Sequence, residues 1–192
     1  MSTSFYYDTA QICKDGHVIN IYEKCHLEKN VKRCPICSEE VISRCLVCQA
    51  PIRGGYIQEL SFKNRTTDPG DVFNTIEKTT VNSKELTKIE DYQPPAYCHE
   101  CGAAYPWTES LLNDADAIID SFDDLSDEQR KLLKERFPDL LTDNPRSISA
   151  ALTYSKLING LDSFSCAVGK GLLIDLLKKH VPEALFTLMQ LG

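Results

Sequence analysis

The alternation of hydrophobic and polar residues changes character about half way along the chain. Up to residue 107 the apolar residues form short segments separated by turn-forming residues, whereas beyond it they recur at the three- and four-residue intervals of amphipathic helices. This second part is predicted to form helices over residues 108–122, 126–137, 144–160, 162–180 and 182–191. Short connections between such helices predict a helical bundle.

Several boundaries of these helices are marked by capping residues. Ser126 is followed three residues later by Gln129, the pattern of a capping box, and Pro138 is expected to end the helix that begins there. Asn144 suits the N-cap of the next helix, with Pro145 at its first position. The last two helices are strongly apolar, which favours a place in the core over a partner surface.

The first part of the chain contains short segments typical of strands. Residues 55–62, "GYIQELSF", alternate apolar and polar positions as a half-buried strand does, and residues 11–12 and 18–22 are predicted as shorter strands. Residues 71–81 fit a strand or a short helix, and residues 83–92 fit one or two helical turns. We therefore predict an α+β protein with a domain at residues 1–107 and a helical domain at residues 108–192.

The composition is that of a folded protein. Hydrophobic residues make up 42% and charged residues 26% of the 192 positions, and no apolar run approaches the roughly 20 residues that cross a bilayer. The N-terminal "MSTSFYYDTA" lacks the basic start and apolar segment of a secretory signal, so the cytoplasm is the expected location. In that reducing compartment, disulfides are a poor explanation for nine cysteines.

The cysteines are grouped in a pattern typical of metal binding. Eight of the nine lie in the first 101 residues, and six of them form C-x-x-C pairs at Cys34/Cys37, Cys45/Cys48 and Cys98/Cys101. Two intervening residues allow a tight turn to direct both thiolates at one ion, the geometry that tetrahedral Zn²⁺ requires. A single pair is equally typical of a redox dithiol, but three pairs in one chain favour zinc.

Two closed tetrahedral sites need eight ligands, so two further donors are expected upstream. Cys13 and His17 supply one thiolate and one imidazole, and Gly16 between them gives the turn freedom at positive φ. Cys25 and His26 compete for this role. Because they are adjacent and their side chains diverge along an extended chain, they cannot easily bind one ion together, but either of them can replace His17.

The pairing of these donors follows from the segment "SEEVISR" between Cys37 and Cys45. A strand of seven residues spans about 25 Å at about 3.3 Å per residue, and the segment has no glycine, proline or asparagine for a turn back to the same ion. The preferred sites are therefore Cys13, His17, Cys34 and Cys37, and Cys45, Cys48, Cys98 and Cys101. The alternative joins Cys34/Cys37 to Cys45/Cys48. The prediction is two consecutive zinc-ribbon (rubredoxin-like) sites with two Zn²⁺ per chain and an insertion at about residues 59–93.

Five segments of the chain together resemble a known family. They are "YDTAQICKDGHVIN", "CPIC", "CLVC", "PIRGGY" and "DYQPPAYCHECGAAYPWTE", within residues 6–56 and 92–109. In order and spacing they are similar to a family of uncharacterised bacterial zinc-ribbon proteins with a domain of unknown function. The resemblance implies zinc ligation at the same eight positions and no specific activity. It leaves Cys25, His26 and Cys166 outside that set, and residues 61–90 form a longer segment than is usual in the family.

Nothing in the sequence indicates an enzyme. A catalytic zinc keeps a position open for water, whereas both predicted sites have four protein ligands. The sequence contains no G-x-x-x-x-G-K-[ST] and no G-x-G-x-x-G motif, and His26, His99 and His180 have no evident nucleophile partner. We therefore expect no catalytic residues.

The charge counts against nucleic acid as the main partner. The formal net charge is −7, and seven thiolates with two Zn²⁺ would make it −10. A basic stretch at Lys24, Lys29, Lys32 and Arg33 keeps nucleic-acid binding as the alternative, and the acidic run from Asp114 to Glu128 is interpreted as a solvated helix surface. We expect a non-enzymatic zinc-binding protein, an interaction or scaffold module with a protein partner or a second copy of itself.

Overall fold

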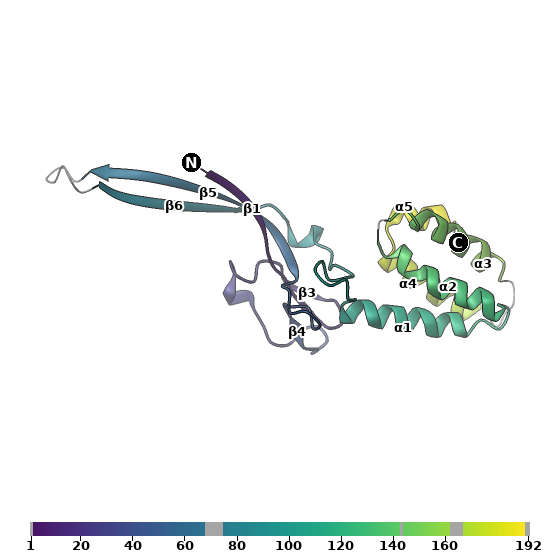
Figure 1. Ribbon diagram of the computed structural model, residues 1–192. Helices are drawn as coiled ribbons and strands as arrows, with labels where there is room; N and C mark the ends of the chain where they lie inside the picture. Colours follow the sequence, from purple (N-terminus) through teal and green to yellow (C-terminus); the bar gives the residue numbers. More distant parts are fainter. Residues whose placement is uncertain (1, 68–74, 143, 162–166, 191–192) are drawn as a thin grey trace. The chain divides into compact units, whose positions relative to one another are not determined.

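Two small antiparallel sheets and five α-helices make up the part of the chain that the computed structural model describes, residues 2–67, 75–142, 144–161 and 167–190 (Figure 1). The α+β class predicted from the sequence is confirmed. The chain divides into two units, Met1–Pro106, which contains both sheets, and Trp107–Gly192, which is helical.

The larger sheet is built from β1 (Ser2–Thr9), β5 (Arg53–Thr67) and β6 (Thr75–Glu85), in the order β1-β5-β6. Tyr7 of β1 lies opposite Tyr56, and the pairing of β1 ends at Ser2 opposite Ser61. Beyond that point β5 and β6 continue as a two-stranded ribbon to the pair Thr67 and Thr75 (Figure 1). The sequence patterns did not predict β1.

The smaller sheet has the order β3-β2-β4, with β2 (Gln11–Cys13) between β3 (Val18–Asn20) and β4 (Val41–Ile42). Ile12 at its centre is fully buried. In the segment predicted as one extended strand between Cys37 and Cys45, only the two residues of β4 are strand, because each end of the segment belongs to a turn.

The insertion is mostly strand. The element predicted at residues 71–81 is a strand where the structure describes it, because residues 75–81 belong to β6. Residues 71–74 lie outside the described residues. One or two helical turns were expected at residues 83–92, but only the 3₁₀ turn η2 (Ile89–Asp91) forms there. The first residues of this segment are strand, because β6 continues to Glu85 in register with β5.

β5 passes very close to the segment after β3 at two adjacent glycines. A Cβ on Gly54 would overlap the carbonyl oxygen of Ile21, and one on Gly55 would overlap the ring of Tyr22. The Tyr22 hydroxyl then donates to the Thr87 carbonyl at 2.7 Å and accepts from the Thr87 N–H at 3.0 Å. This crossing ties the insertion to the small sheet.

Replacing Gly54 by alanine is therefore expected to destabilise the first unit by about 1–3 kcal/mol, because the backbone of β5 must move away from Ile21. Denaturant unfolding followed by tyrosine fluorescence measures the change. Gly171→Ala in α4 is the control, since its Cβ would meet no atom within 4 Å and alanine favours a helix by about 1 kcal/mol. Equal stability of wild type and Gly54→Ala would contradict the close crossing.

The helical unit consists of α1 (Pro106–Asp120), α2 (Asp127–Leu140), α3 (Ser147–Asn159), α4 (Ala167–His180) and α5 (Glu183–Met189). The capping box of Ser126 and Gln129 is present. The expectation that Pro138 ends α2 is wrong: the helix continues to Leu140, since a proline so close to the C-terminus removes only one backbone bond. Cys166 lies outside the described residues.

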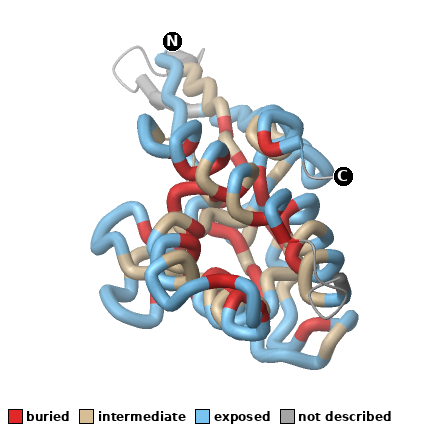
Figure 2. The backbone as a smooth tube through the Cα atoms, turned by 90° about the vertical axis from the view of Figure 1, so that its right-hand side faces the viewer, coloured by how far each residue is buried: buried red, intermediate tan, exposed pale blue. Residues whose placement is uncertain are grey.

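The helices bury one hydrophobic cluster that includes residues of all five helices (buried positions are red in Figure 2). Phe137 of α2 and Tyr154 of α3 are fully enclosed, with ring centroids 6.2 Å apart, and the Tyr154 hydroxyl donates to the Leu133 carbonyl. Leu173 of α4 and Met189 of α5 are also buried, as the core interpretation of the last helices expects. None of the described helices is both long and apolar enough to span a membrane.

Candidate metal centres

The three C-x-x-C segments fold into the same backbone turn. In each turn the N–H of the residue after the second cysteine donates to the carbonyl of the first cysteine at 2.9 Å, and that residue has positive φ: Ser38 at 65°, Gln49 at 62° and Gly102 at 73°. The N–H of each first cysteine donates at 2.8 Å to a carbonyl five residues later. We call these turns knuckles. These backbone hydrogen bonds hold the two cysteines of each knuckle at one tip.

Cys13 and His17 lie on a fourth turn, at the end of β2 and just before β3. The Cys13 N–H donates to the His17 carbonyl at 3.0 Å, and Gly16 between them has φ of 88°. The His17 N–H donates to the Cys13 sulfur at 3.2 Å. The glycine allows the chain to turn so tightly that thiol and imidazole face the same point.

The first tetrad brings together Cys13, His17, Cys34 and Cys37, whose donor atoms all lie within 4.8 Å of one another. The Cys13 sulfur is 3.7 Å from the Cys37 sulfur. The Nδ1 atom of His17 is 3.4 Å from the Cys13 sulfur and 3.8 Å from the Cys34 sulfur. The imidazole therefore presents Nδ1 to this site.

The second tetrad brings together Cys45, Cys48, Cys98 and Cys101, again within 4.8 Å. Sulfur–sulfur distances are 3.7 Å between Cys45 and Cys101 and 3.6 Å between Cys48 and Cys98. Cys45 and Cys98 are buried, whereas Cys48 and Cys101 are exposed. The structure thus groups the predicted residues in the preferred pairing, and the alternative that joins Cys34/Cys37 to Cys45/Cys48 does not occur.

These distances match the edges of a tetrahedron around a metal ion. Sulfur atoms about 2.3 Å from a central ion are about 3.8 Å apart, and an imidazole nitrogen at about 2.0 Å lies about 3.5 Å from each sulfur. The observed edges of 3.4 to 3.8 Å agree with both values. Both tetrads fit a tetrahedral ion with four protein donors, and no corner remains for water.

The thiols of each tetrad resist ionising together. Backbone N–H groups, first that of Cys101, lower the pKa of Cys98 to about 6. The Ala50 N–H also lowers the pKa of Cys48, but desolvation of its sulfur and the three neighbouring thiols outweigh it and raise that pKa to about 12. In the first tetrad, the pKa of Cys37 is likewise raised to about 12: the Glu39 N–H lowers it, but burial and the Asp15 carboxylate outweigh that effect. A dication removes this repulsion, since it allows all the sulfurs to be thiolates.

Neighbouring side chains brace the knuckles, and the sequence analysis missed them. Arg33 donates to the carbonyl of Ser38 at 3.0 Å, and Arg44 donates to that of Gln49 at 3.1 Å. Both arginines directly precede the first cysteine of a pair, so the repeated R-C-x-x-C was the available signal. Tyr105 is a further neighbour of the second tetrad. It is buried, and the pKa of its hydroxyl is raised mainly by burial and secondarily by the nearby Cys98 thiolate.

Cys25 and His26 do not reach either tetrad. The Cys25 N–H donates to the buried Asp8 carboxylate at 3.2 Å, and burial followed by Asp8 raises the pKa of the Cys25 thiol to about 11. The imidazole of His26 lies between the carboxylates of Glu85 and Glu28. The structure therefore places His17, not Cys25 or His26, beside Cys13.

Glycine in place of Ser38 is expected to stabilise the first unit by up to about 1 kcal/mol, because serine at φ of 65° bears a strain that glycine does not. The midpoint of denaturant unfolding of the metal-loaded protein measures the gain. Ile36→Gly in the same knuckle is the control: Ile36 has no positive φ, so glycine there should only destabilise through the unfolded chain. Equal decreases in stability for Ser38→Gly and Ile36→Gly would show that Ser38 bears no backbone strain.

Comparison with known proteins identifies a family. A family model described as "Uncharacterized protein conserved in bacteria (DUF2321)" matches residues 6–74 and 74–185, nearly the whole chain. No curated protein and no solved structure matches the chain.

Proposed function

The chain belongs to this family of uncharacterised proteins conserved in bacteria, and we propose that it is a non-enzymatic zinc-binding protein whose two metal sites are structural. The observation behind the proposal is the closure of both tetrads: four protein donor atoms surround each centre, all within 4.8 Å of one another. The first unit is then a pair of zinc ribbons.

The donor sets support zinc over other metals. Thiolate and imidazole suit Zn²⁺, whereas Ca²⁺ and Mg²⁺ require oxygen ligands. One Cys₃His set and one Cys₄ set are both common for structural zinc. A single iron ion is the competing occupant of a Cys₄ site, and metal analysis distinguishes it from zinc.

The same donors argue against catalysis at the metal. Three or four thiolates give the centre a net negative charge, which weakens the ion as a Lewis acid and as an activator of water. Catalysis would also need an open corner, and each tetrad already has four donors. Both ions are better suited to fixing the chain, because each joins turns that are distant in the sequence.

Rigid knuckles suit a module that binds another protein. Their tips expose large apolar side chains at Ile36 (70%), Leu46 (54%) and Val47 (72%). Metal and backbone bonds hold these tips in place before any partner arrives, so little conformational entropy is lost on binding. We propose that the first unit serves as such an interaction scaffold.

Metal analysis with cobalt substitution tests the structural sites. Purified protein should contain two zinc ions per chain, and the absorption of the Co²⁺-loaded form should not change with added azide or cyanide, because no coordination position is open. One zinc per chain, bound iron, or a spectral shift with azide would overturn the proposal. The Cys25→Ser variant is the control, since it must retain both ions.

A further inference from the structure

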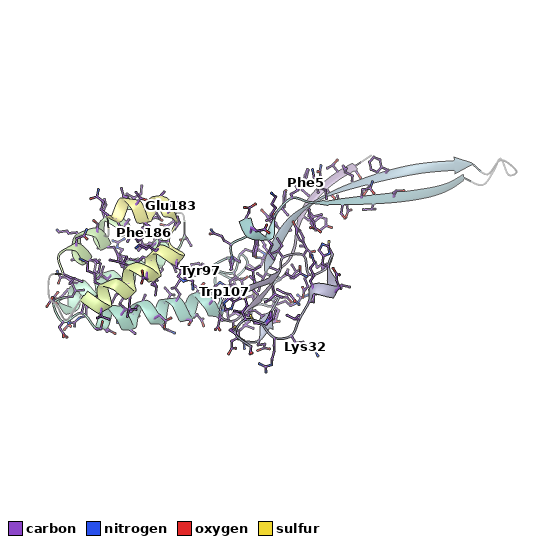
Figure 3. The ribbon with its side chains drawn as sticks, turned by 180° about the vertical axis from the view of Figure 1, so that it is seen from behind. Phe5, Lys32, Tyr97, Trp107, Glu183 and Phe186 are labelled. Carbon is purple, nitrogen blue, oxygen red and sulfur yellow. The ribbon has the colours of Figure 1, made fainter. Side chains whose placement is uncertain are left out.

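Three aromatic rings gather on one face of the larger sheet. Strand alternation puts Phe5 and Tyr7 on the same face of β1, and the register puts Tyr56 of β5 opposite Tyr7. The Tyr56 ring centroid lies 4.8 Å from that of Tyr7 and 5.9 Å from that of Phe5, whose plane is nearly parallel to it. We call this side of the sheet, which carries Phe5, Tyr7, Tyr56 and Arg53, the aromatic face (Phe5 is labelled in Figure 3).

Two of the three rings are exposed to solvent, and Tyr56 is half-buried beside them. Phe5 and Tyr7 are each 52% exposed, which is unusual for neighbouring large aromatic side chains in contact with one another. Arg53 is exposed and lies over the Tyr7 ring, with its guanidinium carbon 5.5 Å from the ring centroid. Exposed aromatic rings and a cation in contact with one of them are thus presented together.

The two faces of this sheet differ in charge. Glu59 lies on the face opposite to the aromatic face, where its carboxylate accepts a hydrogen bond from the Tyr6 hydroxyl at 3.4 Å. Ile57 shares that face because it is two positions from Glu59, and Glu85 shares it because it pairs directly with Ile57. Lys84 pairs with Gln58 and so shares a face with Tyr56. Among the described side chains of the sheet, the aromatic face therefore bears cations and no exposed carboxylate.

We propose that the aromatic face binds single-stranded nucleic acid. Unpaired bases have π-faces that stack on aromatic side chains, and phosphates between them need cations such as Arg53 and Lys84. A second copy of this chain would bring like charges together at this face. An acidic peptide would contact only the cations, and a proline-rich peptide would contact only the aromatic rings. The inference goes beyond the proposed metal sites and does not depend on which metal they hold.

The net charge of −7 does not oppose this site, because most of the excess lies elsewhere. The helical unit has 9 Lys and Arg against 14 Asp and Glu, whereas the first unit has 12 against 14. The net charge of the whole chain is thus the sum over two units that differ in charge. At the aromatic face the local sign is positive, and that sign determines phosphate binding.

Fluorescence anisotropy of labelled oligonucleotides tests the inference with the full-length, metal-loaded protein. The probes are 12-nucleotide dT and rU strands and a duplex of the same length, at low ionic strength. Both single strands should bind, because stacking does not read the sugar, and the duplex should bind more weakly, because its bases are already stacked. Affinity should fall as salt is raised.

Variants on the two faces of β1 identify the surface. Tyr7→Ala should weaken binding at least about fivefold, the loss expected for one base–aromatic stack. Tyr6→Ala is the matched control, since Tyr6 is the neighbouring exposed tyrosine on the opposite face, and it should leave affinity unchanged. Arg53→Gln should reduce the slope of log affinity against log salt by about 0.7.

Several results would overturn the inference. They are no binding at low ionic strength, equal losses in Tyr6→Ala and Tyr7→Ala, preference for the duplex, and sedimentation showing a dimer that Tyr7→Ala separates. Metal content and thermal midpoint, measured on every variant, show whether the fold is intact. Because metal content is measured separately, failure of oligonucleotide binding leaves the proposed zinc sites standing.

Discussion

Replacing Cys98 by serine is expected to remove the second zinc ion and unfold much of the first unit. A serine hydroxyl remains protonated at neutral pH, so the site would keep three of its four ligands. A structural zinc site contributes roughly 10–16 kcal/mol, as much as the whole stability of a typical domain. An ion held by this tetrad would also join Cys98 to Cys45, across the insertion, and the described cysteines form no disulfide that could replace that link.

Mass spectrometry of metal content and limited proteolysis measure this outcome. Wild type should resist cleavage in the first unit, whereas Cys98→Ser should be cleaved there and leave a helical fragment. Cys25→Ser is the control, because Cys25 is a cysteine of the same unit but lies outside both tetrads. Protease resistance of Cys98→Ser with a single bound zinc would show that the second site is dispensable.

Replacing Phe137 by alanine should destabilise the helical unit by about 3–5 kcal/mol. The ring is only 1% exposed and packs against Tyr154, so its removal leaves a cavity at the centre of the bundle. Neighbouring helices can fill such a cavity only in part. The loss is a large share of the stability of a unit of this size.

Denaturant unfolding followed by far-ultraviolet circular dichroism measures the effect. Phe137→Leu should lose less, since leucine fills much of the same space, and Val168→Ala should change little, because Val168 is 73% exposed. Equal losses for Phe137→Ala and Val168→Ala would mean that the bundle is not packed as described.

The grouping of the metal-site residues followed from the spacing of the sequence. C-x-x-C allows few geometries, and the segment between Cys37 and Cys45 contains no glycine, proline or asparagine, from which we predicted that the chain leaves one tetrad before it enters the next. The pairing was right, although only Val41 and Ile42 of the segment are strand. The number of donors that two closed sites need called for two upstream ligands and favoured Cys13 and His17, but it left Cys25 and His26 open as replacements for His17. Local chemistry was sufficient here because the ligands within each pair are close in sequence.

β1 could not be predicted in the same way. Its Phe5, Tyr6 and Tyr7 are consecutive aromatic residues, exposed by 52%, 39% and 52%, so neither side of the strand shows the alternation that marks a buried face. What makes it a strand is its pairing with β5, about fifty residues away. That partner is fixed by the glycine crossing at Gly54, a long-range contact that no local pattern records.

The knuckles have a consequence for mutational tolerance. Their shape is set by backbone hydrogen bonds, the cysteines and one left-handed residue each, and not by the identity of the two side chains between the cysteines. These residues are Pro35 and Ile36, Leu46 and Val47, and His99 and Glu100, whose side chains contact each other in the third knuckle. In a saturation mutagenesis screen for folded protein, these six positions should accept most substitutions, while Ser38 and Gln49 should favour glycine and asparagine. Any stricter preference for apolar residues at the tips would then measure selection for binding, separate from selection for folding.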